Sequence, residues 1–205
     1  MRTECLKITP FNPEKGKIDF IIKVFSRGGI VVLPTETVYG VGFDLESDCA
    51  LKKINNVKNQ RDKKPYAVCI PDSSWIKNYD IEEQSLKNFS LIKDFLPGPI
   101  TFIMTAKDKC KIGFRIPANN ITQQVLFAFL KPIGLSSANM SHQTPARGVQ
   151  EAIDYLWGKV DLIVDGGPSD LCVPSLVVDL SFSPIQILRS GPIFITQEVK
   201  KRFKI

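Results

Sequence analysis

Segments with the spacing of amphipathic helices alternate with short apolar runs along most of the chain, and near its end apolar runs follow one another directly. This alternation is typical of helices packed on a mixed β-sheet. The chain has no internal repeat, low-complexity tract or Pro/Ser-rich linker. The pattern predicts one α/β domain over residues 1–205, with polar loops at the strand ends and 168–174 as its most flexible loop. We expect helices at 12–27, from Ser47 to about 58, and at 82–95, 123–130, 149–157 and 196–202, and strands at 30–34, 66–70, 100–104, 132–137, 161–165, 175–180 and 184–189.

The first expected helix carries the clearest local signals. Asn12 is suited to cap it and Pro13 to its first turn. Gly28 and Gly29 end it, because glycine is favoured where a helix terminates. Its apolar residues recur at helical spacing, at Ile18, Ile21, Ile22 and Phe25.

Composition bounds the class of protein. The chain has 205 residues, of which 43% are hydrophobic and 23% charged, as in soluble globular proteins. No apolar stretch approaches the roughly 18 residues of a membrane span, and the N-terminus has no apolar signal-peptide core, so we expect a cytoplasmic protein. The cysteines form no CxxC pair and are odd in number, which favours reduced, mostly buried thiols at Cys5, Cys49, Cys69, Cys110 and Cys172.

The charge balance favours anionic partners. The net charge is +6 and the pI about 9.0, which suits nucleotides, phosphates or nucleic acid. His142 is the only histidine, so chemistry that needs a histidine base or several histidine ligands is nearly excluded. Few acidic residues lie in the candidate segments, which disfavours a metal cage of several carboxylates.

Two polar segments follow expected strands. In "PTETVYGVG", at 34–42, Thr35 and Thr37 could donate to a ligand that the glycines let approach, although an ordinary turn also explains the segment. It contains neither common glycine-rich phosphate pattern. In "LSSANMSH", at 135–142, serines and an asparagine suit either a plain turn or a nucleotide cradle. No nucleophile elbow surrounds Ser137, so a hydrolase is disfavoured.

Cations mark three further places. The loop "KNQRDKKP", at 58–65, is either solvated, the usual fate of a charge run, or a triphosphate clamp. Arg115 lies between apolar residues in "GFRIP", and Arg189 ends a strand in "ILRSG". Each needs a partner, which is either one of the 21 acidic residues or a carboxylate of a ligand.

Taken together and in order, these segments resemble the YrdC-type threonylcarbamoyl-AMP synthase family over roughly residues 20–195. One such motif is weak evidence, whereas seven in register are specific. The resembling segments are "GGIVVLPTETVYGVG", "KNQRDKKP", "PGPITFI", "GFRIP", "SSANMS", "PSLVVDL" and "ILRSG".

The resemblance implies a twisted, open mixed sheet flanked by helices, with a concave basic face, and the short single-domain type without an additional C-terminal domain. It implies that L-threonine, bicarbonate and ATP give threonylcarbamoyl-AMP and pyrophosphate. Mg²⁺ would arrive with ATP. A transferase machinery would then modify the tRNA adenosine beside the anticodon, and the chain itself is a possible tRNA binder.

The resemblance also implies residue roles. Thr35, Arg115 and Ser175 would bind threonine, with Arg115 on its carboxylate. None acts as a general acid or base, and no residue is expected to bind a metal. Within the basic loop, the assignment among Arg61, Lys63 and Lys64 stays open, because the usual spacing differs. The ATP site would be lined by Lys58, Arg61, Thr101, Ser137, Asn139 and Arg189.

Two rival functions share this architecture. A non-catalytic RNA-binding or ribosome-maturation module also suits the basic charge, and consumption of ATP that depends on threonine distinguishes the two. A carbamoyl-transfer domain of the hydrogenase-maturation type normally belongs to a much larger chain with zinc-finger and acylphosphatase segments. The near-complete motif set favours the synthase.

Overall fold

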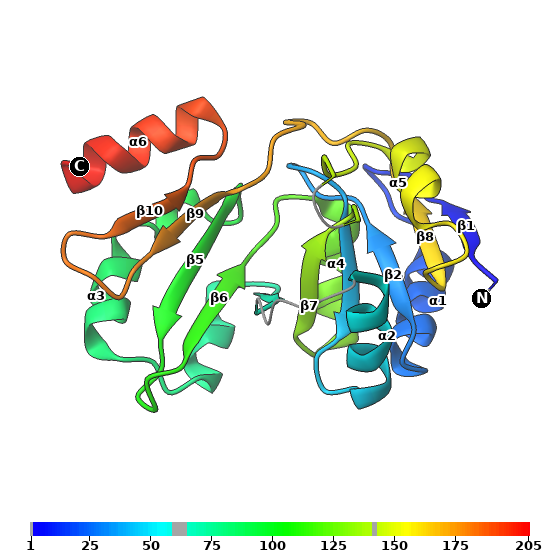
Figure 1. The fold of residues 1–205 in the computed structure, drawn as a ribbon, viewed down its shortest axis with the longest axis horizontal. Coiled ribbons are helices and arrows are strands. Elements are labelled where there is room, and N and C mark those ends of the chain that lie inside the picture. The colour runs from blue at the N-terminus through cyan, green and yellow to red at the C-terminus, as the bar shows by residue number, and fades with distance from the viewer. Residues whose placement is uncertain (1, 59–64, 141–142) are drawn as a thin grey trace.

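The computed structural model describes residues 2–58, 65–140 and 143–205, whose strands form one ten-stranded sheet (Figure 1). Its order is β1-β8-β2-β3-β7-β4-β6-β5-β9-β10, with both parallel and antiparallel pairs, which confirms the predicted open mixed sheet flanked by helices. The strands are β1 Glu4–Lys7, β2 Ile30–Leu33, β3 Gly40–Asp44, β4 Ala67–Cys69, β5 Ile100–Thr105, β6 Lys111–Arg115, β7 Ile133–Ser137, β8 Leu162–Asp165, β9 Leu176–Asp179 and β10 Gln186–Arg189. The helices are α1 Lys15–Ser26, α2 Asp48–Lys58, α3 Glu83–Ser90, α4 Asn120–Phe129, α5 Val149–Leu156 and α6 Ile193–Phe203, with 3-10 helices at Ser73–Asn78 and Lys93–Phe95.

Every predicted strand is present, and three more were not predicted: β1, β3 and β6. The glycines of β3 favour a turn when the sequence is considered alone. In the fold, a Cβ on Gly40 would lie 2.8 Å from the side chain of Leu135 on the neighbouring β7, so that side chain would have to move. The absence of a side chain at Gly40 therefore leaves room for Leu135 where the two strands pair.

The start of α1 differs from the prediction. Glu14, not Asn12, is its N-cap residue, and the carboxylate of Glu14 accepts a hydrogen bond from the Thr9 backbone at 3.1 Å and pairs with Lys17 at 2.6 Å. A backbone N–H before the helix and the Lys17 ammonium within it thus hold Glu14 in place, and the helix starts three residues after Asn12. The end is as predicted, because Gly28 has a φ of 69° and donates its N–H to a carbonyl of the last turn.

Helices cover both faces of the sheet at the neighbouring strands β8 and β2. Val31 and Leu33 of β2 pack in one cluster with α1 and α4, whereas Ile30 and Val32 pack in another with α2 and α5. All four are fully buried. A strand covered on both faces needs no polar alternate residues, which explains the continuous apolar run.

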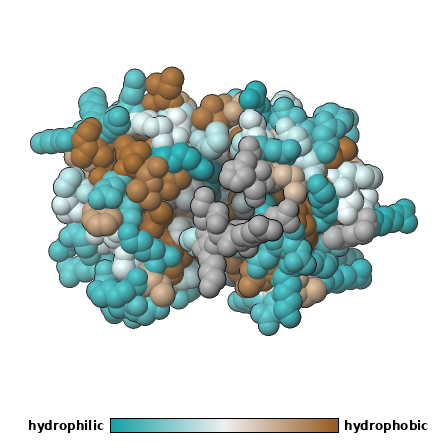
Figure 2. Space-filling view, viewed as in Figure 1, coloured by the Kyte–Doolittle hydropathy of each residue, from teal (hydrophilic) through white to brown (hydrophobic). Residues whose placement is uncertain are grey.

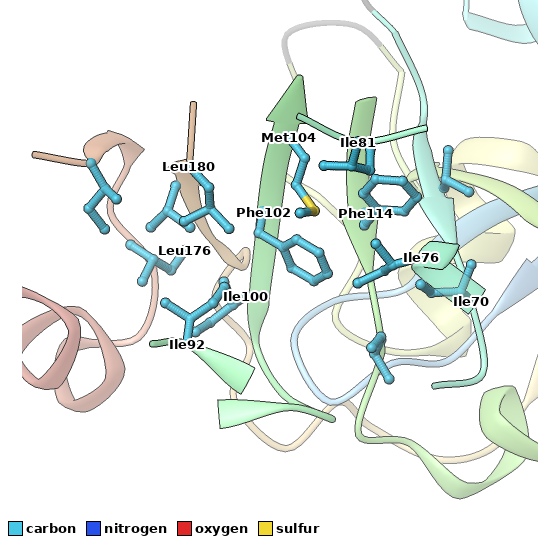
Figure 3. Packing of buried hydrophobic residues seen from close by; sticks show 14 of the residues in the cluster. Ile70, Ile76, Ile81, Ile92, Ile100, Phe102, Met104, Phe114, Leu176 and Leu180 are labelled. Atoms are coloured by element: carbon cyan, nitrogen blue, oxygen red, sulfur yellow. The ribbon is translucent and has the colours of Figure 1, made fainter. Parts of the chain in front are cut away.

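The sheet from β6 to β10 differs, because β5 alternates between a buried and a half-buried face. Ile100, Phe102 and Met104 enter a core cluster with Phe114 of β6 (Figure 3). Thr101, between them, is only half-buried. Since successive side chains point to opposite faces, one face of this part of the sheet stays open.

Most of the surface seen in Figure 2 is hydrophilic, and hydrophobic side chains gather on the side of the molecule that carries β10 and α6. Leu188, Ile193 and Phe194 are exposed there. No helix in the described part of the chain is both long and apolar enough to cross a bilayer.

The expectation of mostly buried thiols is wrong. Only Cys69 is buried, at the centre of the sheet, and the other four cysteines are exposed. Their surroundings explain the difference: Cys5 lies on the edge strand β1, Cys49 in the first turn of α2, and Cys172 in a turn with a φ of 52°. Scattered cysteines therefore did not indicate burial.

The aromatic centre of the β5–β6 core should dominate the stability of that half. Phe102 is fully buried, with its ring centroid 5.1 Å from that of Phe89 and 5.8 Å from that of Phe114. We expect Phe102→Ala to lower the free energy of unfolding by about 3–5 kcal/mol, measured by urea denaturation. Phe11→Ala is the matched control, because Phe11 is 95% exposed, and should change it by less than about 0.5 kcal/mol. Equal effects of the two substitutions would contradict this description of the core.

Candidate functional site

A cleft of about 350 Å³ lies over the open face of the sheet. Its floor is one row of residues on four adjacent strands: Arg115 pairs with Thr101, Thr101 with Val177, and Val177 with Arg189, this last pair following a register irregularity between Ile187 and Arg189. Residues paired in register point to the same face, so this row is presented together. Segments from the other half of the sheet close the cleft, with lining residues that include Thr35, Thr37, Tyr39, Gly40 and Ser137.

The cleft brings together most residues predicted for the site. The six that line it are Thr35, Thr101, Arg115, Ser137, Ser175 and Arg189. Lys58 and Asn139 lie directly behind Ser137 and are bonded to it. Arg61, Lys63, Lys64 and His142 lie outside the described residues.

The hydroxyls after β2 serve first to shape their own turn. Thr35 Oγ1 donates to the carbonyl of Val38 at 2.6 Å and accepts from the backbone N–H groups of Thr37 and Val38 at 3.2 and 3.3 Å. It also lies 2.9 Å from Thr37 Oγ1. Thr35 is 2% exposed. The turn is therefore closed by its own side chains, as Thr and Ser commonly do.

Arg115 is held by two side chains of this same turn. Its Nη2 donates to Glu36 Oε1 and to Thr37 Oγ1, both at 2.8 Å. Arg115 and Glu36 are 6% and 5% exposed, so the ion pair is buried. Nε of Arg115 and Oε2 of Glu36 have no hydrogen-bond partner among the described residues. From the sequence, the partner of Arg115 is either an acidic residue or a ligand. The structure shows the acidic residue, Glu36, while Nε of the guanidinium stays unbonded among the described residues.

Ser175 connects the second arginine to the floor of the cleft. Arg189 donates through Nε and Nη2 to the Ser175 carbonyl at 3.1 and 3.0 Å, and through Nη2 to its hydroxyl at 3.1 Å. That hydroxyl lies 2.8 Å from Thr101 Oγ1. Burial chiefly, and the nearby charge of Arg115 secondarily, lower the pKa of Arg189 from its usual value. The two guanidinium groups therefore act on the same region.

Gly191 permits this arrangement. A Cβ at Gly191 would lie 2.2 Å from the backbone nitrogen of Leu176, so only glycine allows the segment after β10 to pass against the start of β9. Ser175 immediately precedes Leu176. The glycine thus brings Arg189 and Ser175 to bonding distance.

Lys58 ends α2 inside the protein and supports the turn after β7. Its Nζ donates to the carbonyls of Ser137 and Asn139, the latter at 2.8 Å, and to Asn139 Oδ1 at 3.4 Å. Asn139 Oδ1 also accepts from the Ser137 hydroxyl at 2.6 Å. Burial lowers the pKa of Lys58 to about 8. A positive charge is therefore held beneath the Ser137–Asn139 turn at neutral pH.

Tyr39 anchors the long connection between β8 and β9. Its hydroxyl donates to the Gly167 carbonyl at 2.6 Å, and burial raises its pKa to about 12, which keeps the proton on the oxygen. The connection, expected to be the most flexible loop, is also bonded through Ser169 N to Arg147 O at 2.8 Å and Leu171 N to Glu36 O at 2.9 Å. These contacts hold it over the turn that carries Thr35 and Thr37.

Two site residues, Glu36 and Tyr39, were not predicted from the sequence, and Thr37 was predicted as a donor to a ligand but not as an acceptor for Arg115. All three lie in the hydroxyl-rich segment that the sequence analysis singled out, but spacing within a turn cannot tell which side chain faces inward. Glu36 is the only carboxylate bonded to the cleft cations within the described residues. In that part of the chain no group of three or more His, Cys, Asp and Glu side chains could hold a metal ion.

The chain is similar to several known proteins along most of its length. A putative threonylcarbamoyl-AMP synthase of Methanocaldococcus jannaschii is 29% identical over 94% of this chain and 95% of its own. The threonylcarbamoyl-AMP synthase of Bos taurus is 33% identical over 88% of this chain and 71% of its own.

The crystal structure of P. abyssi Sua5 complexed with L-threonine superposes with a TM-score of 0.86 at 26% identity. The match covers 98% of this chain but only 61% of the P. abyssi chain. The Sua5/YciO/YrdC family model, described as telomere recombination, matches residues 23–191. The chain therefore belongs to the Sua5/YciO/YrdC family.

Proposed function

We propose that this chain is an L-threonylcarbamoyladenylate synthase, a nucleotidyltransferase that uses L-threonine, bicarbonate or CO₂, and ATP. The observation that carries the proposal is the charge of the cleft. Among the residues that the structure describes, Arg115, Arg189 and the buried Lys58 surround hydroxyl groups, and the one carboxylate bonded to these cations, Glu36, is already paired with Arg115. Such a site suits a substrate pair with several negative charges. The names of the relatives, and the threonine in the P. abyssi complex, support the same activity.

The reaction needs little acid–base chemistry from the protein. The free amine of threonine bonds to the carbon of CO₂ and loses a proton, which gives a carbamate. A carbamate oxygen then attacks the α-phosphorus of ATP, and the bond from that phosphorus to pyrophosphate breaks. The protein chiefly orients two anions and neutralises their charge, which fits a site of cations and hydroxyls.

We propose that the two substrates occupy opposite sides of the cleft. We assign Arg115, Ser175 and Thr35 to threonine, with the unbonded part of the Arg115 guanidinium facing its carboxylate. Thr35 forms a wall of this subsite, since its hydroxyl proton is held by Val38. We assign ATP to the opposite side, at Lys58, Thr101, Ser137, Asn139 and Arg189, together with Arg61.

Mg²⁺ fits this scheme as an ion carried by ATP. Glu36, the carboxylate that the described residues place on a cleft cation, is bonded to Arg115. The ion would therefore keep waters and phosphate oxygens as its ligands, as Mg²⁺ commonly does with nucleotides. Its charge would help neutralise the phosphates.

The product is an activated acyl group, so a second step must use it. We propose that a tRNA threonylcarbamoyl-transferase takes threonylcarbamoyl-AMP to the adenosine beside the anticodon, in the cytoplasm. The basic net charge of +6 is consistent with contact with tRNA. In this scheme residues 1–205 act as one domain of the family.

The decisive experiment is mass spectrometry of a mixture of the protein, ATP, Mg²⁺, bicarbonate and threonine. We expect threonylcarbamoyl-AMP, and pyrophosphate release that requires both threonine and bicarbonate. Equal release without threonine would replace the synthase by a generic nucleotidase. No nucleotide turnover at all, together with RNA binding, would favour the non-catalytic RNA-binding module.

Arg115 should affect threonine more than ATP. We expect Arg115→Ala to weaken threonine binding by about 2–5 kcal/mol, because the partner of a buried charge is lost. ATP affinity should change little. Isothermal titration calorimetry with each substrate measures both. Arg202→Ala, at an exposed arginine on α6 beside Phe95, is the control. Unchanged threonine affinity in folded Arg115→Ala would limit Arg115 to its ion pair with Glu36.

Lys58 should make ATP binding depend on pH. With a pKa of about 8 in the free protein, Lys58 is charged below that pH and neutral above it, and a bound triphosphate favours the charged form. ATP binding then takes up a proton above pH 8. We expect the Kd for ATP to rise about tenfold from about pH 7.5 to about pH 9, with threonine affinity less affected. Lys58→Arg keeps its charge throughout this range and should remove the pH dependence. The same slope in Lys58→Arg would assign the proton to another group.

A further inference from the structure

We propose that Thr37 is a positioning residue whose hydroxyl fixes the guanidinium of Arg115 at the angle that binds the substrate carboxylate. Thr37 is fully buried and lines the cleft beside Arg115. The inference rests on the proposed function, since it concerns how the same site holds threonine. Thr37 would act on the substrate indirectly, through Arg115.

The direction of each hydrogen bond around Thr37 follows from counting protons. Thr35 Oγ1 must donate to the Val38 carbonyl, because a carbonyl only accepts. Thr35 therefore has no proton left for its 2.9 Å contact with Thr37, and Thr37 is the donor there. Toward Arg115 the Thr37 oxygen can then only accept. The chain of bonds runs from Arg115 to Thr37, to Thr35 and to Val38, and none of its members is free to turn.

The grip on Arg115 limits how the guanidinium can meet a ligand. Both protons of Nη2 are used, one by Glu36 and one by Thr37. A bidentate contact with a carboxylate needs Nη2 together with a neighbouring nitrogen, because Cδ of the side chain lies between the remaining pair, Nε and Nη1. While Nη2 stays bonded, Nη1 can make only a monodentate contact with the carboxylate. A bidentate contact fixes the relative orientation of the two groups, whereas in a monodentate contact that orientation depends on how the arginine is held.

Thr37 gives a cleaner test of this grip than Glu36 does. Replacing Glu36 would also change the charge of the site and thus the attraction of any anion. Thr37 is neutral, and valine has nearly its shape without the hydroxyl. A change in threonine affinity on Thr37→Val therefore reports the orientation of Arg115.

The experiment compares Thr37→Val, Thr37→Ser and Thr122→Val by calorimetry with threonine and, separately, with ATP. Thr122 is the matched control, because it is 1% exposed and its hydroxyl donates to the Pro34 carbonyl at 2.5 Å, next to the same turn, without contact with Arg115. We expect Thr37→Val to raise the Kd for threonine about tenfold, the effect of losing one charge-assisted hydrogen bond. Thr37→Ser, which restores the oxygen, and Thr122→Val should each stay within about twofold.

A double substitution distinguishes the positioning of Arg115 from a general loosening of the turn. In an Arg115→Ala background, Thr37→Val should change threonine affinity by less than about twofold, because the group it positions is gone. An equal effect in both backgrounds would overturn the inference, as would equal effects of Thr37→Val and Thr122→Val.

The outcome for the wild-type protein separates the two proposals. Threonine binding by the wild type with unchanged affinity in Thr37→Val would overturn the role of Thr37 and leave the proposed function standing. No threonine binding by the wild type would overturn both.

Discussion

The buried ion pair between Arg115 and Glu36 joins the two halves of the site. Glu36 belongs to the turn that follows β2, and Arg115 ends β6 in the other half of the sheet. Removing either charge would leave the other buried without a partner, a loss that typically costs about 3–5 kcal/mol. Glu36 also accepts a backbone hydrogen bond from the β8–β9 connection. One residue thus holds the turn, the floor of the cleft and the segment above it in a single arrangement.

The cleft exists because the sheet is covered unequally. Helices on both faces make β2 a continuous apolar strand, whereas β5 has one buried face and one face that carries Thr101. An open sheet face in water favours polar side chains, and here those are the hydroxyls and guanidinium groups of the floor. The position of the site therefore depends on the uncovered face of the sheet at β5 as much as on the residues that line it.

The sequence predicts those elements whose apolar pattern is strong. Each strand with a clear apolar run was found, and so was each predicted helix, except that the one expected at 82–95 is divided into α3, which ends at Ser90, and a 3-10 helix at Lys93–Phe95. The three missed strands lack that signal: β1 is a short edge strand with charged ends, and β3 and β6 contain glycine. Gly40 leaves room for the side chain of Leu135 on another strand, and the sequence around Gly40 alone cannot predict that contact.

For the site, the motifs predict which segments meet but not which atoms bond. Thr35 and Thr37 were both predicted as possible donors to a ligand, and the structure shows that Thr35 donates its proton to the backbone of Val38 whereas Thr37 accepts from Arg115. Such assignments depend on the path of a turn in three dimensions. The partner of Arg115 is 79 residues away in the chain, which pattern analysis of either segment alone cannot supply.

The row of residues on the cleft floor also sets the distance between the two arginines at its ends. Arg115 and Arg189 lie three strands apart, and since neighbouring strands are about 4.8 Å apart, their Cα atoms are separated by about 14 Å. This length is set by backbone hydrogen bonds across β6, β5, β9 and β10 rather than by side chains. Substitutions on the floor can alter what is recognised at either end, but the distance between the ends can change only if a strand is gained, lost or shifted in register. A substrate of a different reach would require a different sheet.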